Sequence, residues 1–287
     1  MTTSASTLGL EVHNELRFEF GKNWARFLRT VDESRVREAE LSLQKALRVH
    51  DLAGMSFLDV GSGSGLFSLA ARRLGARVHS FDYDPDSVSC TRALRERFLP
   101  GDPRWTVGCG SVLDEDYLRS LGQFDIVYSW GVLHHTGNMY RALDLVALAV
   151  APNGRLLVSI YNDQGVISAR WRALKKAYVR SPRPGRFAIA VLTLGLTWLR
   201  GIPKDILRFK PLRTLKAWRA YCQQRGMSPW HDVVDWAGGY PFEVAKPEEI
   251  FEFYRDRGFR LQHLKTCGGG KGCNEFVFLR EQEGKKE

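Results

Sequence analysis

The chain has 287 residues, of which 44% are hydrophobic and 26% are charged. These values exclude a disordered or fibrous protein, and the length fits one domain of roughly 200–250 residues plus an insertion. The net charge is +10. The five cysteines are irregularly spaced, and this spacing excludes a disulfide framework and favours a reducing compartment. We therefore expect a cytoplasmic protein.

A helical stretch comes first in the predicted order of elements. Apolar residues recur near the 3.6-residue period over residues 28–49, and Asp32 or Ser34 is expected to cap the start of this helix. Residues 1–11 contain neither a basic start nor an apolar run, so we expect no signal peptide. We assign residues 1–50 to an N-terminal helical segment.

Short apolar runs then alternate with helical stretches, a pattern typical of a mostly parallel sheet covered by helices on both faces. The alternation stops at residues 162–240 and then resumes. We therefore predict an α/β fold with a Rossmann-like seven-stranded sheet, formed by residues 51–161 and 241–287. The expected strands are 56–60, 77–81, 105–109, 124–129, 155–161, 259–264 and 274–280, and the expected helices are 66–74, 86–98, 139–150 and 246–257.

The interruption carries most of the positive charge. Residues 166–230 hold 15 Lys or Arg and a single acid, Asp205, for a net charge of +14. They also hold the longest apolar run, residues 187–199, which is too short to cross a bilayer as a helix because a crossing needs about 20 residues. We predict that residues 162–240 form a helical basic cap, inserted after the fifth strand at the ligand-binding edge of the sheet.

Three interpretations of the basic cap remain open. The cap can bury its apolar run and hold its charges in water. It can instead lie on an anionic membrane surface as a peripheral contact, or cover an anionic or lipid-like substrate. Nucleic acid is the least favoured partner, although clustered Arg with Trp171, Trp198 and Trp218 suits a nucleic-acid backbone.

A glycine-rich turn is the strongest local motif. Asp59 begins the run Asp-Val-Gly-Ser-Gly-Ser-Gly, which follows a predicted strand and opens a helix, and its glycines allow a tight turn and close approach of a ligand to the backbone. Asp82 closes the next strand, 17 residues after Gly65, where an acid can accept both ribose hydroxyls of an adenosine. Asp59 disfavours a pyrophosphate and suits a cationic ligand, so the charges favour S-adenosylmethionine over NAD.

These motifs resemble those of the class I S-adenosylmethionine-dependent methyltransferases, over residues 57–161 and 246–280. The resemblance implies that the glycine turn holds the methionine part of the cofactor and that Asp82 holds the ribose. It further implies an adenine-binding segment at residues 110–114 and an N-terminal segment that folds over the cofactor. The cofactor-binding residues expected on this basis are Asp59, Gly61, Ser62, Gly63, Gly65, Asp82, Tyr83, Ser111, Val112, Ser129, Trp130 and Lys22.

Within this class, the run Val132-Leu133-His134-His135 and the general layout resemble small-molecule methylases that include the 2-polyprenyl-6-hydroxyphenol O-methyltransferases. The resemblance implies a small-molecule acceptor. The long insertion after the fifth strand departs from that family's pattern.

Two groups of histidines are candidates for the chemistry at the acceptor. His134 and His135 follow the fourth strand at the functional edge of the sheet, where a base of near-neutral pKa assists methylation of a hydroxyl. Adjacent side chains diverge, so we expect one of the two to face the acceptor, with His135 preferred. His231, beside two acids, is the second candidate, and helix capping is its alternative role. The expected acceptor contacts are Tyr161, Trp236, Tyr240 and Glu243, and no metal-ligand cluster is expected.

We therefore expect an S-adenosylmethionine-dependent methyltransferase that acts at an oxygen atom of a hydrophobic or anionic small molecule. Methylation of RNA or protein is one alternative, and it would require a basic cap that is open and not packed on the site. A cofactor-binding scaffold without catalytic activity is the other.

Overall fold

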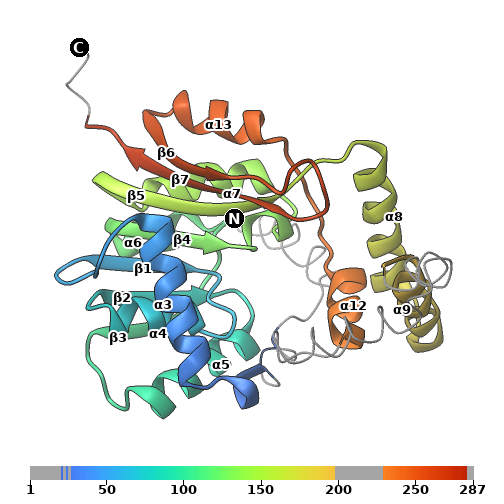
Figure 1. Cartoon of the computed structure of the whole chain (residues 1–287), viewed down its shortest axis with the longest axis horizontal. Helices are drawn as coiled ribbons and strands as arrows, with labels where there is room; N and C mark the ends of the chain where they lie inside the picture. The colour runs from blue at the N-terminus through green and yellow to red at the C-terminus, as the bar shows by residue number, and fades with distance from the viewer. Residues whose placement is uncertain (1–20, 22–23, 25–26, 198–228, 283–287) are drawn as a thin grey trace, which may run out of the picture. The chain divides into compact units, whose positions relative to one another are not determined.

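The computed structural model describes residues 21, 24, 27–197 and 229–282. The chain separates into two compact units (Figure 1). The larger unit comprises Glu19–Gly165 and Glu243–Glu287, and the smaller unit contains Val166–Phe242.

A seven-stranded sheet with the order β3-β2-β1-β4-β5-β7-β6 is the centre of the larger unit. The five strands from β3 to β5 are parallel, and β7 is antiparallel to both of its neighbours. This confirms the predicted Rossmann-like, mostly parallel sheet. The strands are β1 (Ser56–Val60), β2 (Arg77–Asp82), β3 (Trp105–Cys109), β4 (Phe124–Trp130), β5 (Val150–Tyr161), β6 (Phe259–Lys265) and β7 (Cys273–Arg280).

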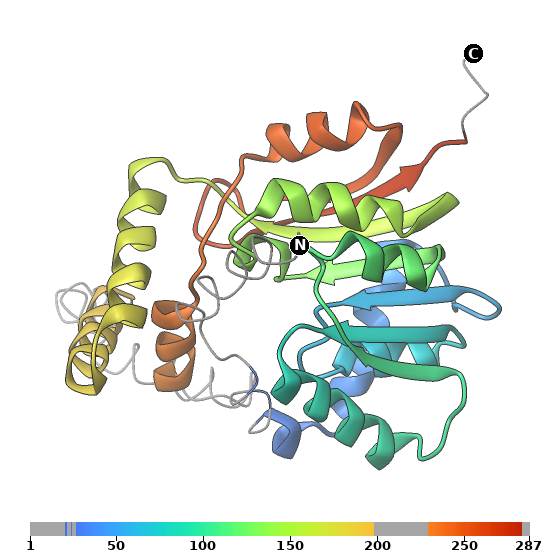
Figure 2. The same cartoon turned by 180° about the vertical axis from the view of Figure 1, so that it is seen from behind.

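Helices cover both faces of this sheet. One hydrophobic cluster packs α3, α4 and α5 against one face, and a second packs α6, α7 and α13 against the other (Figures 1 and 2). The helical elements of the larger unit are η1 (Leu28–Thr30), α3 (Glu33–Leu47), α4 (Leu66–Arg73), α5 (Pro85–Phe98), α6 (Glu115–Leu121), η2 (Leu133–His135), α7 (Met139–Leu148) and α13 (Pro247–Arg255).

The sequence explains where most of these elements begin. Asp32 caps α3 by accepting a hydrogen bond from the amide of Arg35 at 3.0 Å, one of the two caps expected. One helix was not predicted, and one strand begins earlier than predicted. The seven-residue helix α6, capped by Asp114, is too short for a periodicity signal. Strand β5 begins at Val150, before the predicted start at residue 155, and Asn153, with a φ of 59°, lies within its irregular first part.

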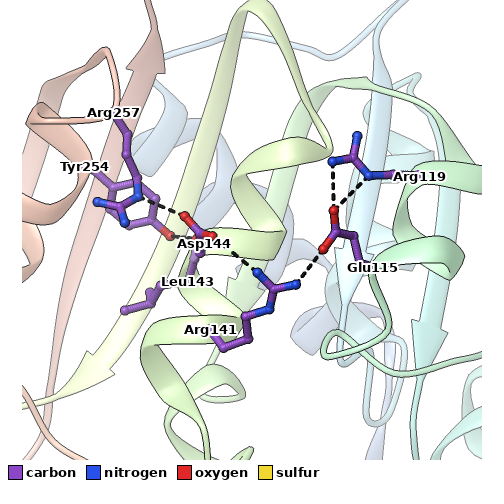
Figure 3. Close-up of polar contacts among 7 residues, drawn as sticks. All are labelled: Glu115, Arg119, Arg141, Leu143, Asp144, Tyr254 and Arg257. Carbon is purple, nitrogen blue, oxygen red and sulfur yellow. Dashed lines mark hydrogen bonds and ion pairs between the residues drawn. The ribbon is translucent and has the colours of Figure 1, made fainter.

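Alternating charges connect the helices that cover one face of the sheet (Figure 3). Glu115 on α6 binds Arg119 at 2.8 Å and Arg141 on α7 at 2.5 Å. Asp144 binds Arg141 at 3.6 Å and Arg257, just beyond α13, at 3.0 Å. Each exposed pair contributes little alone, but the chain of pairs fixes α6, α7 and α13 relative to one another.

The smaller unit contains α8 (Val166–Arg180), α9 (Arg183–Thr197) and α12 (Pro229–Gly238). Its small core includes Tyr178, Ala190 and Val233. Lys175 is fully buried and donates a hydrogen bond to the carbonyl of Trp236, and its ammonium lies 4.0 Å from the centroid of the Trp236 ring. Among the described helices, none is long and apolar enough to cross a membrane.

A residue distant in the sequence caps the start of α7. Both carboxylate oxygens of Glu243 accept from the amide of Met139, at 3.1 and 3.2 Å, and the amide of Glu243 donates to the carbonyl of His134 at 3.0 Å. A carboxylate is favourable there because the first amides of a helix lack partners within it and carry partial positive charge. Glu243 therefore connects α7 to the turn that precedes it.

Replacing Glu243 with Ala removes this cap. We expect a loss of about 1–2 kcal/mol in the free energy of unfolding, measured by urea denaturation. Glu243→Gln should lose less, because its amide oxygen still accepts a hydrogen bond. Glu252→Ala, at an exposed position of α13, is the matched control and should leave the free energy nearly unchanged. An Ala variant at position 243 as stable as the wild type would contradict the capping role.

Candidate functional site

The glycine turn links β1 to α4 at the carboxyl edge of the parallel strands. Gly61, Gly63 and Gly65 have φ values of +78°, +54° and +80°, which other residues rarely adopt. The surrounding residues also leave no room for a side chain at Gly61 or Gly65. A Cβ atom on Gly61 would lie 2.5 Å from both methyl carbons of Val132, and one on Gly65 would lie 2.9 Å from a carbon of Thr91. Both the backbone conformation and the packing therefore require glycine in this turn.

The end of β2 fixes the position of the turn. The amides of Gly61 and Ser62 donate to the carbonyl of Phe81 at 2.9 and 3.0 Å. The amide of Gly63 donates to the Asp82 carboxylate at 2.9 Å, and the amide of Asp84 donates to its other oxygen at 2.9 Å. These two amides orient the carboxylate of Asp82 at the edge of the sheet.

Asp59 lies at the end of a buried chain of hydrogen bonds. Trp105 on β3 donates to Ser80 on β2 at 2.8 Å, Ser80 donates to Ser68 on α4 at 2.7 Å, and Ser68 donates to Asp59 on β1 at 2.5 Å. Burial raises the pKa of Asp59 to about 7; the Ser68 hydrogen bond opposes this rise and the charge of Asp82 adds to it. A cationic group bound nearby would favour the ionised form of Asp59.

The other predicted cofactor residues fall into two groups. Tyr83 and Trp130 are exposed, so their rings are accessible to a ligand. The remaining side chains have intramolecular partners: Ser62 pairs with Thr91 at 2.9 Å, Ser111 accepts from the amide of Leu113 at 3.1 Å, Ser129 donates to the carbonyl of Val60 at 3.2 Å, and Val112 lies in the core.

The N-terminal segment reaches this site. A Cβ atom on Gly63 would lie 3.0 Å from the ring of Trp24, and the amide of Gly21 donates to the carboxylate of Asp84 at 2.8 Å. Trp24 and Asp84 were not among the predicted site residues. The only signal for Trp24 was its place in an aromatic N-terminal run, and Asp84 was identifiable only as a residue following a strand. The predicted partner of the methionine carboxylate, Lys22, lies outside the described residues.

A cluster of aromatic rings forms the candidate acceptor side of the site. The ring centroid of His134 lies 4.0 Å from that of Tyr161 and 4.6 Å from that of His135, and the centroids of His135 and Tyr161 are 5.5 Å apart. His134 is fully buried and His135 is partly exposed, so His135 is the histidine that a ligand can reach. This matches the expectation that one of the pair packs in the interior.

The other predicted acceptor contacts come from the smaller unit and from the segment that follows it. Trp236 and Tyr240 belong to the smaller unit, where Trp236 packs against Lys175 and Trp171. The carboxylate of Glu243 caps α7, a structural task that sequence reasoning missed because the two residues are 104 positions apart. His231 belongs to α12, but its side chain is outside the described part of the chain.

The donor set fits S-adenosylmethionine on charge. Asp59 and Asp82 place two carboxyl groups beside the glycine turn, a combination that favours a ligand with an ammonium and a sulfonium over a phosphate. Across the described residues, no group of three or more His, Cys, Asp or Glu side chains could hold a metal ion.

Comparisons with known proteins agree with this assignment. The methyltransferase domain family matches residues 31–227. A tRNA U34 carboxymethyltransferase from Methylococcus capsulatus is 35% identical over 40% of this chain and 34% of its own length. A ubiquinone biosynthesis O-methyltransferase from Methylobacterium sp. is 30% identical over 39% of this chain and 43% of its own length. The chain thus spans only about a third to a half of the curated relatives it matches.

Solved structures share the fold at low sequence identity. Magnesium protoporphyrin IX methyltransferase from Synechocystis, with bound S-adenosylhomocysteine, superposes with a TM-score of 0.52 and 16% identity, covering 91% of this chain and 95% of its own. An O-methyltransferase family protein from Burkholderia thailandensis gives a TM-score of 0.51 and 15% identity, covering 87% of this chain and 58% of its own. Because the family model matches most of its length, the chain belongs to the methyltransferase domain family, and its cofactor is S-adenosylmethionine.

Proposed function

We propose that this protein transfers a methyl group from S-adenosylmethionine to an oxygen atom of a small-molecule acceptor. The observation that carries the proposal is the contact between the glycine turn and the residue that leads into η2. Gly61 packs so closely against Val132 that no side chain fits between them, and His135 lies three residues further along the chain. The cofactor-binding turn and the candidate base therefore share one edge of the sheet.

The bound cofactor would supply an electrophilic methyl group on a sulfonium. The chain's own contribution is positioning and proton transfer. Asp82 would hold the ribose of the ligand beside the glycine turn, whose own amides donate to Phe81 and Asp82. His135 would take the hydroxyl proton as the acceptor oxygen bonds to the methyl carbon and the bond from that carbon to the sulfonium sulfur breaks, which releases S-adenosylhomocysteine. Tyr161 packs beside both histidines and orients the ring of His135.

The acceptor class rests on two lines of support. Ubiquinone biosynthesis O-methyltransferases recur among the curated relatives, and each acts on a small molecule at oxygen according to its name. The partly exposed His135 is the side chain that an oxygen acceptor needs, because a hydroxyl must lose its proton during methylation.

Transfer of a labelled methyl group tests this proposal. Purified protein is incubated with methyl-labelled S-adenosylmethionine and a bacterial extract, and the products are separated into organic-soluble, aqueous small-molecule and macromolecular fractions. We expect label in a small-molecule fraction. Label confined to RNA or protein would contradict the small-molecule acceptor, and cofactor binding without any transfer would contradict enzymatic activity.

Replacing His135 with Ala should slow this transfer about 10²–10⁴-fold, the usual contribution of a general base. The affinity for S-adenosylhomocysteine should stay unchanged, which separates proton transfer from cofactor binding. His50→Ala, at an exposed position before β1, is the matched control and should transfer at the wild-type rate. An undiminished rate in the His135 variant would remove His135 from the mechanism.

The raised pKa of Asp59 predicts a pH-dependent affinity for the cofactor. Below a pH of about 7 Asp59 is mostly protonated, so binding of a cationic ligand must first release a proton. We expect the affinity for S-adenosylmethionine to rise several-fold between about pH 5.5 and 7, below the range where the ligand's own amino group titrates. Calorimetry over this range measures the effect.

Two variants isolate the contribution of Asp59. Asp59→Asn has no proton to release and should give a flat profile over the same range. Ser68→Ala loses the hydrogen bond that lowers the pKa of Asp59, so its affinity should rise at a higher pH than in the wild type. The same slope in wild type and Asp59→Asn would assign the pH dependence to another group.

A further inference from the structure

Helix α9 is apolar on two opposite sides. Its inner side contributes Ala190, with Ile189 and Leu194, to the small core that it shares with α8 and α12. Its outer side presents four large apolar side chains to solvent. Phe187 is 62% exposed, Val191 45%, Leu192 55% and Leu196 41%.

These four residues form one face. Positions four apart lie close together around a helix, so 187 and 191 form one pair and 192 and 196 form another. At about 100° per residue the two pairs together span the outer half of α9. A surface helix usually turns a polar face to water, and one that is apolar on all sides is normally buried in a protein or a membrane. The outer face of α9 therefore has the composition of a contact surface.

Positive charge accompanies this face in α8 and α9. Residues 166–197, which span α8 and α9, contain no acidic residue. Their basic residues are Arg170, Arg172, Lys175, Lys176, Arg180, Arg183 and Arg186. All of these except Lys175 are exposed, so the two helices that carry the apolar face carry exposed charge of one sign only.

We propose that the outer face of α9, with the basic residues of α8 and α9, binds the surface of an anionic membrane. Apolar side chains of this size insert at the boundary between head groups and acyl chains, while Arg and Lys bind the anionic head groups. Nucleic acid fits less well, because Val191, Leu192 and Leu196 offer neither hydrogen bonds nor aromatic rings for stacking bases. This inference goes beyond methyl transfer and does not depend on it.

Vesicle flotation with the full chain tests the proposal. Phosphatidylcholine vesicles containing about one quarter phosphatidylglycerol are compared with phosphatidylcholine alone. We expect the protein to float with the anionic vesicles and to bind the neutral ones at least about tenfold more weakly. Raising the salt from about 50 to about 500 mM should release much of it, because salt screens the charges of exposed Arg and Lys.

Two double variants separate the apolar and electrostatic contributions. Phe187→Gln with Leu192→Gln should weaken anionic-vesicle binding at least about tenfold, through the loss of apolar contact. Arg180→Gln with Arg183→Gln should weaken it about fivefold for each charge removed. The matched controls are Leu41→Gln, at a 58% exposed leucine of α3, and Arg77→Gln, at an exposed arginine of β2, and both should bind as the wild type does.

Far-ultraviolet circular dichroism reports whether each variant keeps its helices, because the substituted residues of α8 and α9 lie in the smaller unit and cofactor binding in the other unit would not report on their fold. Three results would overturn the proposal: a wild-type chain that stays off anionic vesicles, equal binding to both kinds of vesicle, or controls that lose as much binding as the α9 variants. Binding to a single-stranded RNA oligomer in place of vesicles would also overturn it and assign the surface to nucleic acid.

Discussion

The reversal of the chain from β1 into α4 is the constraint on which the candidate site depends. Three glycines with positive φ make the reversal. The carbonyl of Phe81 and the carboxylate of Asp82 accept hydrogen bonds from the backbone amides of the turn. The same turn leaves no space beside Val132, so its position also fixes the start of η2 and the two histidines. A side chain at Gly61 would therefore displace both the glycine turn and Val132, which leads to the candidate base.

The buried polar residues next to the glycine turn are also held in place, by hydrogen bonds to one another. The hydrogen-bonded chain from Trp105 through Ser80 and Ser68 to Asp59 crosses three strands and one helix within the core. Buried polar groups are costly unless each has a partner, and this chain satisfies them in series. It also holds a carboxyl group in an environment that raises its pKa. The candidate site thus combines a backbone turn that requires glycine with a buried carboxyl group whose pKa is raised.

Most of the frame could be predicted because its information is local. Strands β1 and β3 begin and end at the predicted residues. The glycine turn and Asp82 could also be identified from the sequence, because few other structures require glycines at this spacing followed by an acid at the end of the next strand. The rest depends on contacts between distant residues. The cap of α7 by Glu243, the contact of Trp24 with the glycine turn and the burial of His134 beside Tyr161 each need the folded chain, and α6 is too short for a periodic signal. His135 was preferred from the sequence, and only the folded chain shows that His134 is the buried member of the pair.

Binding of S-adenosylhomocysteine to Asp82→Ala, measured by calorimetry, tests the central claim most directly. Asp82 is expected to accept hydrogen bonds from the ligand's ribose and also orients the turn through Gly63. Since each hydrogen bond to a charged group contributes about 1.5–3 kcal/mol, the account predicts a loss of affinity of roughly a hundredfold or more. Asp86→Ala, at an exposed position in the first turn of α5, should bind like the wild type. Unchanged affinity in Asp82→Ala would contradict the assignment of the cofactor site to this edge of the sheet.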